Sequence, residues 1–236
     1  MDLFTALLKR LFCFLFAAPA AVVHSAVSRP AWVCSLAKQR VVWVRDKSGS
    51  MEGEKARHAS EACQALLNEL ANPANKDGFV VGVVDFNEQA EIVHPFALAS
   101  QWVGKLAPIN PGGYTNVTSG LEQGWSMLEQ AESSDGSGVV YLRPVVIVFS
   151  DGCHNRGERP ETIADKINDK VDLVTVAYGT DADEALLRSL ALTPQHFYRC
   201  RDGKELRAFL KSVGPTIAKT RAAGANATQA LGSMQR

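Results

Sequence analysis

Short apolar runs with almost no polar interruption recur along this chain, and segments with helical spacing separate them. Such runs are typical of strands buried on both faces of a parallel sheet. They span residues 41–44, 79–86, 144–149 and 171–177, and a last short run spans residues 196–199. The alternation predicts an α/β fold: a doubly wound, mostly parallel central sheet with right-handed crossovers and helices on both faces.

The segments between these runs carry helical signals. Residues 52–71 repeat small or apolar side chains at helical spacing, and one of them, Cys63, is expected to be a plain buried thiol. A turn at Asn87-Glu88 followed by residues 90–93 predicts one short antiparallel edge strand. Further helices are predicted over residues 116–130, 159–170, 183–192 and 203–213.

The chain is long enough for one globular domain with appendages. It has 236 residues, 46% of them hydrophobic, which excludes a disordered chain and makes a two-domain enzyme an unfavourable interpretation. We expect an N-terminal extension or signal-like segment over residues 1–37, a folded domain over residues 38–217, and a loosely ordered basic tail over residues 218–236.

The N-terminal segment has the order of features found in secretory signals. Lys9 and Arg10 precede an apolar run over residues 11–23, and small residues follow up to Ala26. The run is too short to predict a stable membrane span. The alternative is an extension that does not act as a signal, with a start site placed too far upstream.

The cysteines bear on the compartment. Five are scattered without the spacing of a zinc site or of a disulfide framework. This narrowly favours the cytoplasm, whereas the protein is exported if residues 1–25 act as a signal peptide.

A formal net charge of zero hides a segregation of charge. Residues 1–45 carry net +5, residues 46–198 carry net −11 and residues 199–236 carry net +6. An acidic body argues against nucleic-acid binding through the domain, because phosphate contacts need clustered Lys and Arg side chains. It is compatible with holding a cation.

Polar clusters stand where ligands bind in open parallel sheets, beyond the carboxyl ends of strands. Asp46, Ser48 and Ser50 follow the first predicted strand at alternating positions, so an extended or turning backbone points all three the same way. Thr115 precedes a predicted helix, and Asp151 follows the strand over residues 144–149. Two carboxylates and three hydroxyls form an all-oxygen donor set, which suits a hard cation such as Mg²⁺.

These residues resemble the von Willebrand factor type A (VWA) domain with its metal-ion-dependent adhesion site (MIDAS). Residues 46–51 (DKSGSM) match the family's Asp-x-Ser-Gly-Ser-Met loop, residues 113–116 (GYTN) look like its threonine loop, and residues 150–152 (SDG) look like its second aspartate loop. The resemblance spans roughly residues 41–213. Within the family, residues 75–79 and 196–198 and the helix after residue 203 look most like bacterial VWA proteins of tellurium-resistance and related stress modules.

The resemblance implies the chemistry of the site. Ser48, Ser50 and Thr115 would bind Mg²⁺ or Mn²⁺ through their hydroxyls, and Asp46 and Asp151 would bind it directly or through water. Family members bind protein partners this way, with a partner's Asp or Glu completing the metal's coordination. We therefore expect an adaptor or scaffold module and not an enzyme.

The same residues are compatible with other functions. An exported, adhesin-like VWA protein shares the chemistry and differs in its location. A metal-assisted hydrolase would use Ser48 or Ser50 with Asp151 and His154, but the chain has no Gly-x-Ser-x-Gly motif. The Asp and Ser side chains could also merely cap helices. Two side chains beside the motifs, Lys47 and Tyr114, could restrict the acidic ligand or simply face solvent.

Overall fold

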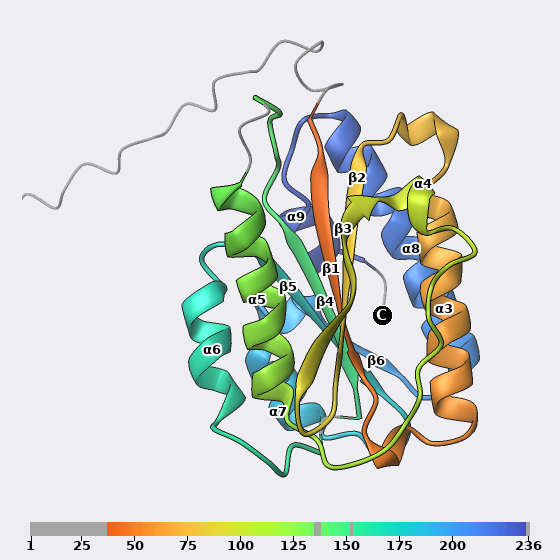
Figure 1. The fold of residues 1–236 in the computed structure, drawn as a ribbon, viewed down its shortest axis with the longest axis vertical. Helices are drawn as coiled ribbons and strands as arrows, with labels where there is room; N and C mark the ends of the chain where they lie inside the picture. Colours follow the sequence, from red (N-terminus) through yellow and green to blue (C-terminus); the bar gives the residue numbers. More distant parts are fainter. Residues whose placement is uncertain (1–36, 135–137, 152, 235–236) are drawn as a thin grey trace, which may run out of the picture.

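The computed structural model describes residues 37–134, 138–151 and 153–234. These residues form one six-stranded sheet in the order β3-β2-β1-β4-β5-β6, and the predicted α/β fold is confirmed (Figure 1). Every neighbouring pair is parallel except β2 with β3. The strands are β1 (Gln39–Asp46), β2 (Phe79–Phe86), β3 (Ala90–Leu98), β4 (Val145–Ser150), β5 (Asp172–Tyr178) and β6 (Phe197–Cys200).

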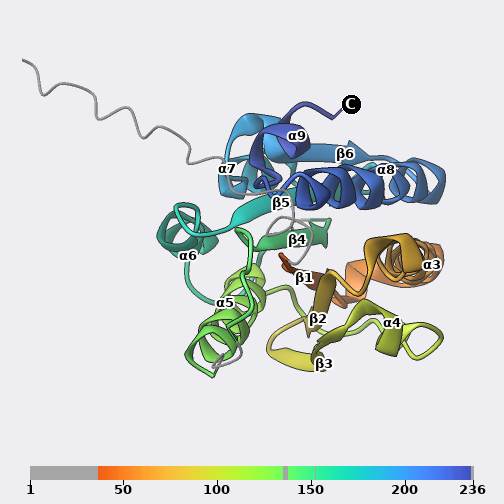
Figure 2. The same ribbon diagram turned by 90° about the horizontal axis from the view of Figure 1, so that it is seen from above.

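Helices cover both faces of the sheet, as Figure 2 shows. The core on one side joins the sheet to α3, α4, α8 and α9, and the core on the other side joins it to α5, α6 and α7. The α-helices are α3 (Glu54–Leu70), α4 (Ala99–Trp102), α5 (Val117–Ser133), α6 (Pro160–Ile167), α7 (Glu184–Leu190), α8 (Gly203–Ala222) and α9 (Thr228–Gly232). Short 3-10 helices are η1 (Gly49–Met51), η2 (Pro73–Asn75) and η3 (Pro194–His196).

Strand β1 illustrates why these sequences form central strands. Val41 and Trp43 pack into the core beside α3 and α8, whereas Val42 and Val44 pack into the core beside α5. The side chains of a strand alternate between the two faces of the sheet, so the middle of a strand covered on both sides favours consecutive apolar residues. Within the described residues, no helix is both long and apolar enough to span a membrane.

Helix α5 lies very close to the sheet because of a glycine. A Cβ atom added at Gly120 would stand 2.7 Å from the Phe86 ring and 2.9 Å from Val44 Cγ1. Only a residue without a side chain allows this approach. The close packing sets the N-terminus of α5 beside the carboxyl end of β1.

The edge strand β3 is longer than predicted. The prediction placed it over residues 90–93, but β3 continues through Pro95 to Leu98. The proline is tolerated because an edge strand needs ladder hydrogen bonds on one side only. The pairing with β2 is irregular around Val83, which accommodates this stretch.

The prediction of a loosely ordered tail over residues 218–236 is wrong for its described part. Helix α8 does not end near Val213 but continues through Pro215 to Ala222, and α9 follows. Arg221 explains the extension, since its buried guanidinium donates to Ala37 O at 3.0 Å and to Asn75 O at 2.9 Å. Tertiary contacts of this kind outweigh the cost of one proline in the helix.

Leu231 anchors α9 to the core, and truncating its side chain should lower the free energy of unfolding. The side chain is fully buried in the core beside α8. We expect Leu231→Ala to lower the free energy of unfolding by about 2–4 kcal/mol in urea titrations. Gln229→Ala, an exposed position on the same helix, should change it by less than about 0.5 kcal/mol. Equal small effects from both variants would mean that α9 is not held to the core.

Candidate metal site

The predicted site residues gather at one edge of the sheet, where the strand order reverses. Strands β1 and β4 are parallel neighbours, and the chain leaves β1 towards β2 but reaches β5 and β6 on the other side of β4. Asp46 is the last residue of β1, and Asp151 directly follows Ser150, the last residue of β4. This switch point is where open α/β sheets bind ligands.

Asp46 organises the loop that follows β1. Its Oδ1 accepts a hydrogen bond from Ser48 N at 2.7 Å, and its Oδ2 accepts one from the Ser150 hydroxyl. Burial raises the pKa of Asp46 to about 6, the hydrogen bonds oppose this shift, and the nearby charge of Asp151 adds to it. A buried carboxylate that is costly to ionise gains from a cation beside it.

The hydroxyls of Ser48 and Ser50 converge. The two Oγ atoms are 3.1 Å apart. Ser48 is buried and Ser50 is exposed. The alternation predicted for this loop therefore brings both hydroxyls to one point at its rim.

Thr115 is held between the other two loops by its backbone. Thr115 N donates to Asn155 Oδ1 at 3.0 Å, and Thr115 O accepts from Asn155 N at 3.0 Å and Arg156 N at 3.2 Å. On the other side, Gly49 N donates to Gly113 O at 3.0 Å. Asn116 caps α5 by accepting from the backbone of Ser119. The three predicted loops thus form one bonded unit, with Thr115 buried inside it.

Asp151 supplies the observation that tests a fit to a cation. Its side chain is fully buried, and its Oδ2 accepts no hydrogen bond from any described residue. A buried carboxylate oxygen that accepts no hydrogen bond is costly unless a cation lies beside it, and the Nζ of Lys55 stands 3.6 Å away. Within the described residues, no three His, Cys, Asp or Glu side chains form a metal-binding group. A cation here must therefore use hydroxyls as well as the two carboxylates, and the residues present fit that requirement.

Lys47, Tyr114 and His154, which lie beside the motifs, each contact other parts of the protein. Lys47 forms an ion pair with Glu91 of β3. Tyr114 is 51% exposed, with the guanidinium carbon of Arg156 4.3 Å from its ring centroid. His154 Nδ1 accepts from Val117 N at 3.2 Å, at the start of α5. The His154 side chain therefore satisfies a backbone N–H group at the N-terminus of that helix.

A buried ion pair that the sequence did not reveal supports the threonine loop. Arg45 donates through Nε and Nη2 to the two carboxylate oxygens of Asp85, at 2.6 and 2.9 Å. Its Nη1 donates to Ala107 O at 3.0 Å, and Ala107 N donates to His94 Nε2 at 3.0 Å. The pair joins β1, β2 and the loop before Thr115. The only sign of this ion pair in the sequence is Asp85, a charged residue inside the apolar run over residues 79–86.

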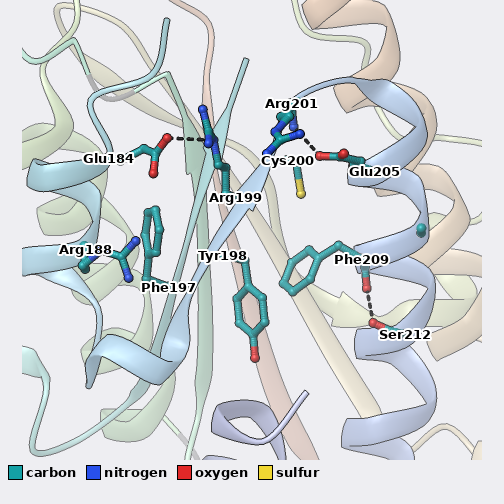
Figure 3. A pocket seen from close by; sticks show the side chains of 11 residues that line it. Glu184, Arg188, Phe197, Tyr198, Arg199, Cys200, Arg201, Glu205, Phe209 and Ser212 are labelled. Carbon is teal, nitrogen blue, oxygen red and sulfur yellow. Dashed lines mark hydrogen bonds and ion pairs between the residues drawn. The ribbon is translucent and has the colours of Figure 1, made fainter. Parts of the chain in front are cut away.

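A cavity of about 660 Å³ lies elsewhere, beside the edge strand β6 between α7 and α8 (Figure 3). Phe197 and Arg199 face α7, and Tyr198 and Phe209 lie on the side of α8. None of the five predicted metal ligands lines it. The cavity is therefore separate from the candidate metal site.

Comparisons with known proteins agree with the fold. The profile of the von Willebrand factor type A domain matches residues 41–212. The chain belongs to the VWA domain family. Inter-alpha-trypsin inhibitor heavy chain H3 of Rattus norvegicus is 27% identical over 173 residues, which cover 68% of this chain and 19% of that protein. The chain thus spans about a fifth of the length of the curated relatives it matches.

Solved VWA structures share the fold. The pilus adhesin SpaC of Lactobacillus rhamnosus GG superposes with a TM-score of 0.65 at 17% identity, covering 78% of this chain and 30% of that one. Proximal thread matrix protein 1 of the mussel byssus, with a zinc-occupied MIDAS motif, gives a TM-score of 0.60 at 19% identity over 78% of this chain and 46% of that one. The narrower resemblance to tellurium-resistance and stress-module proteins stays a prediction.

Proposed function

We propose that this VWA domain binds one divalent cation through Asp46, Ser48, Ser50, Thr115 and Asp151, and through that cation an acidic side chain of a protein partner. The observation that carries the proposal is the buried Asp151 Oδ2, which accepts no hydrogen bond from the residues that the structure describes, at the edge where the serine hydroxyls converge. VWA adhesion modules bind protein partners, which supports the second half of the proposal.

The donor set explains why an acidic partner is the expected ligand. Serine and threonine hydroxyls are neutral, so a cation held by three of them and two carboxylates remains electrophilic. An Asp or Glu carboxylate completes such a coordination shell better than a neutral group does. The domain body carries net −11 over residues 46–198, so long-range steering opposes an acidic partner. The attraction must therefore act locally, at the cation.

A binding role fits the site better than hydrolysis. A hydrolase of this design needs a serine in contact with a base. Among the described residues, His154 contacts the backbone of Val117, and no contact links it to Ser48 or Ser50. The relatives and neighbours are inhibitor heavy chains, a pilus adhesin and a byssus matrix protein, which supports a non-enzymatic role.

The identity of the cation and the location of the protein belong to the same proposal. Oxygen-only ligands favour Mg²⁺ or Mn²⁺, although the mussel byssus protein with a similar fold holds zinc in its MIDAS motif. The similarity to pilus-associated proteins favours the exported alternative. The narrow preference for the cytoplasm drawn from the cysteines has no support among the comparisons.

Peptide capture tests the proposed function. We would immobilise the full chain and select a random peptide library in Mg²⁺, then elute with EDTA. The eluted peptides should be enriched in Asp and Glu, since their carboxylates complete the metal's coordination. Asp151→Asn should lose this capture, whereas Asp165→Asn, an exposed carboxylate on α6, should keep it. Capture that persists in EDTA or in Asp151→Asn would contradict the proposal.

A further inference from the structure

The ammonium group of Lys55 lies at the edge of the candidate metal site. Lys55 lies in the first turn of α3, and its Nζ donates to both carboxylate oxygens of Asp181, at 2.7 and 3.0 Å. The same Nζ stands 3.6 Å from Asp151 Oδ2. That distance is within ion-pair range but too long for a hydrogen bond. Lys55 is therefore shared between one buried and one exposed carboxylate.

The loop after β5 is shaped to hold this arrangement. Gly179 adopts φ +108°, and a Cβ atom there would stand 2.7 Å from Asp181 Oδ1 and 3.0 Å from Lys55 Cε. A side chain at this position would thus be strained and would also displace the pair. The loop is fixed to the site by Asp183 N, which donates to Asp151 O at 2.7 Å.

The buried carboxylate of Asp151 is only partly neutralised by Lys55. Asp151 Oδ2 is buried and accepts no hydrogen bond from the described residues, although Lys55 Nζ is near. The shorter contacts of Lys55 go to Asp181, whose side chain is 60% exposed. A divalent cation on Asp151 would repel the ammonium group, and Asp181 is already placed to retain it.

We propose that Lys55 is an internal counter-cation of the metal site, shared between Asp151 and Asp181, which weakens the site for divalent cations and passes wholly to Asp181 when one binds. This inference rests on the proposed function of the site. Asp181 accordingly acts through Lys55: it draws the ammonium group away from Asp151 and so favours the divalent cation.

The two side chains should shift cation affinity in opposite directions. Lys55→Met removes the competing charge while keeping the length of the side chain, and should lower the Kd for Mg²⁺ by about tenfold. Asp181→Asn leaves Lys55 with Asp151 alone, and should raise the Kd by about threefold. In the double variant the effect of Asp181→Asn should disappear, because there is no ammonium group left to draw away.

Calorimetric titration of the full chain with MgCl₂ tests this inference. Lys47→Met is the matched control, because Lys47 also lies beside the site but pairs with Glu91; its Kd should stay within about twofold of the parent's. A tighter Lys55→Met together with a weaker Asp181→Asn supports the inference, as does Mg²⁺ binding by Lys55→Met alone.

Three results would contradict the inference or part of it, and they are distinguishable. If the parent binds Mg²⁺ and Lys55→Met binds it with the Kd of Lys47→Met, the role of Lys55 is wrong and the metal site stands. If neither the parent nor Lys55→Met binds Mg²⁺, both the inference and the proposed function are wrong. If Asp181→Asn keeps its full effect without Lys55, Asp181 does not act through Lys55.

Discussion

Asp85→Ala is expected to lower the free energy of unfolding by about 3–5 kcal/mol. Arg45 has no exposed surface, and both its Nε and Nη2 donate to Asp85. Burial raises the pKa of Asp85 despite the neighbouring guanidinium, so the pair recovers only part of its desolvation cost. Removing one partner nevertheless leaves an uncompensated charge in the core. Urea unfolding followed by circular dichroism measures the loss.

The cross-strand neighbour of Asp85 provides the control. Glu91 on β3 pairs in register with Asp85 but is exposed and bonded to Lys47. Glu91→Ala should cost less than about 1 kcal/mol. Replacing Arg45 by Met together with Asp85 by Leu should cost less than Asp85→Ala alone, because no charge is left unpaired. If Asp85→Ala costs no more than Glu91→Ala, the pair does not support β1, β2 and the threonine loop.

The second large effect is the change in melting temperature caused by Asp46→Asn. We expect its sign to depend on whether a divalent cation is present. Burial raises the pKa of Asp46 from 3.8 to about 6, so the folded chain binds a proton there more tightly than the unfolded chain does. The corresponding stability is lost as the pH rises through this interval, and ionised Asp46 costs the metal-free protein up to about 3 kcal/mol at neutral pH. In EDTA the variant should therefore melt at a higher temperature than the parent.

Saturating Mg²⁺ should reverse that order. The parent gains the binding free energy of the cation, whereas Asp46→Asn lacks the carboxylate and gains little. Scanning calorimetry in EDTA and in Mg²⁺ gives both comparisons, with Asp165→Asn as the exposed control. A parent whose melting temperature does not respond to Mg²⁺, or a variant that responds equally, would remove Asp46 from the ligand set.

The sequence predicts those parts of the fold that local pattern determines. The unbroken apolar runs predict the buried strands, because only strands covered on both faces need apolar residues throughout. The alternation of Asp46, Ser48 and Ser50 predicts convergent side chains, and the two serine hydroxyls lie 3.1 Å apart. Neighbouring positions in the chain decide these features, so they can be recognised without coordinates.

Features that depend on distant residues could not be predicted. Gly214-Pro215 looks like the end of a helix, and α8 continues because Arg221 bonds to Ala37 and Asn75, far away in the sequence. Asn155, which holds the backbone of Thr115, stands 40 positions from it. Lys55 and Asp181 are 126 positions apart. Contacts of this kind depend on how the loops meet at the sheet edge, and no local spacing encodes that.

A count of bound Mn²⁺ tests the central claim most directly. Electron paramagnetic resonance measures free Mn²⁺ during a titration and so gives the number of ions held per chain. We predict one ion per chain for the parent and for Asp165→Asn, one ion displaced by excess Mg²⁺, and none for Asp151→Asn. If Asp151→Asn binds Mn²⁺ as the parent does, or if the parent binds none, the assignment of a cation site to the edge of β1 and β4 is wrong.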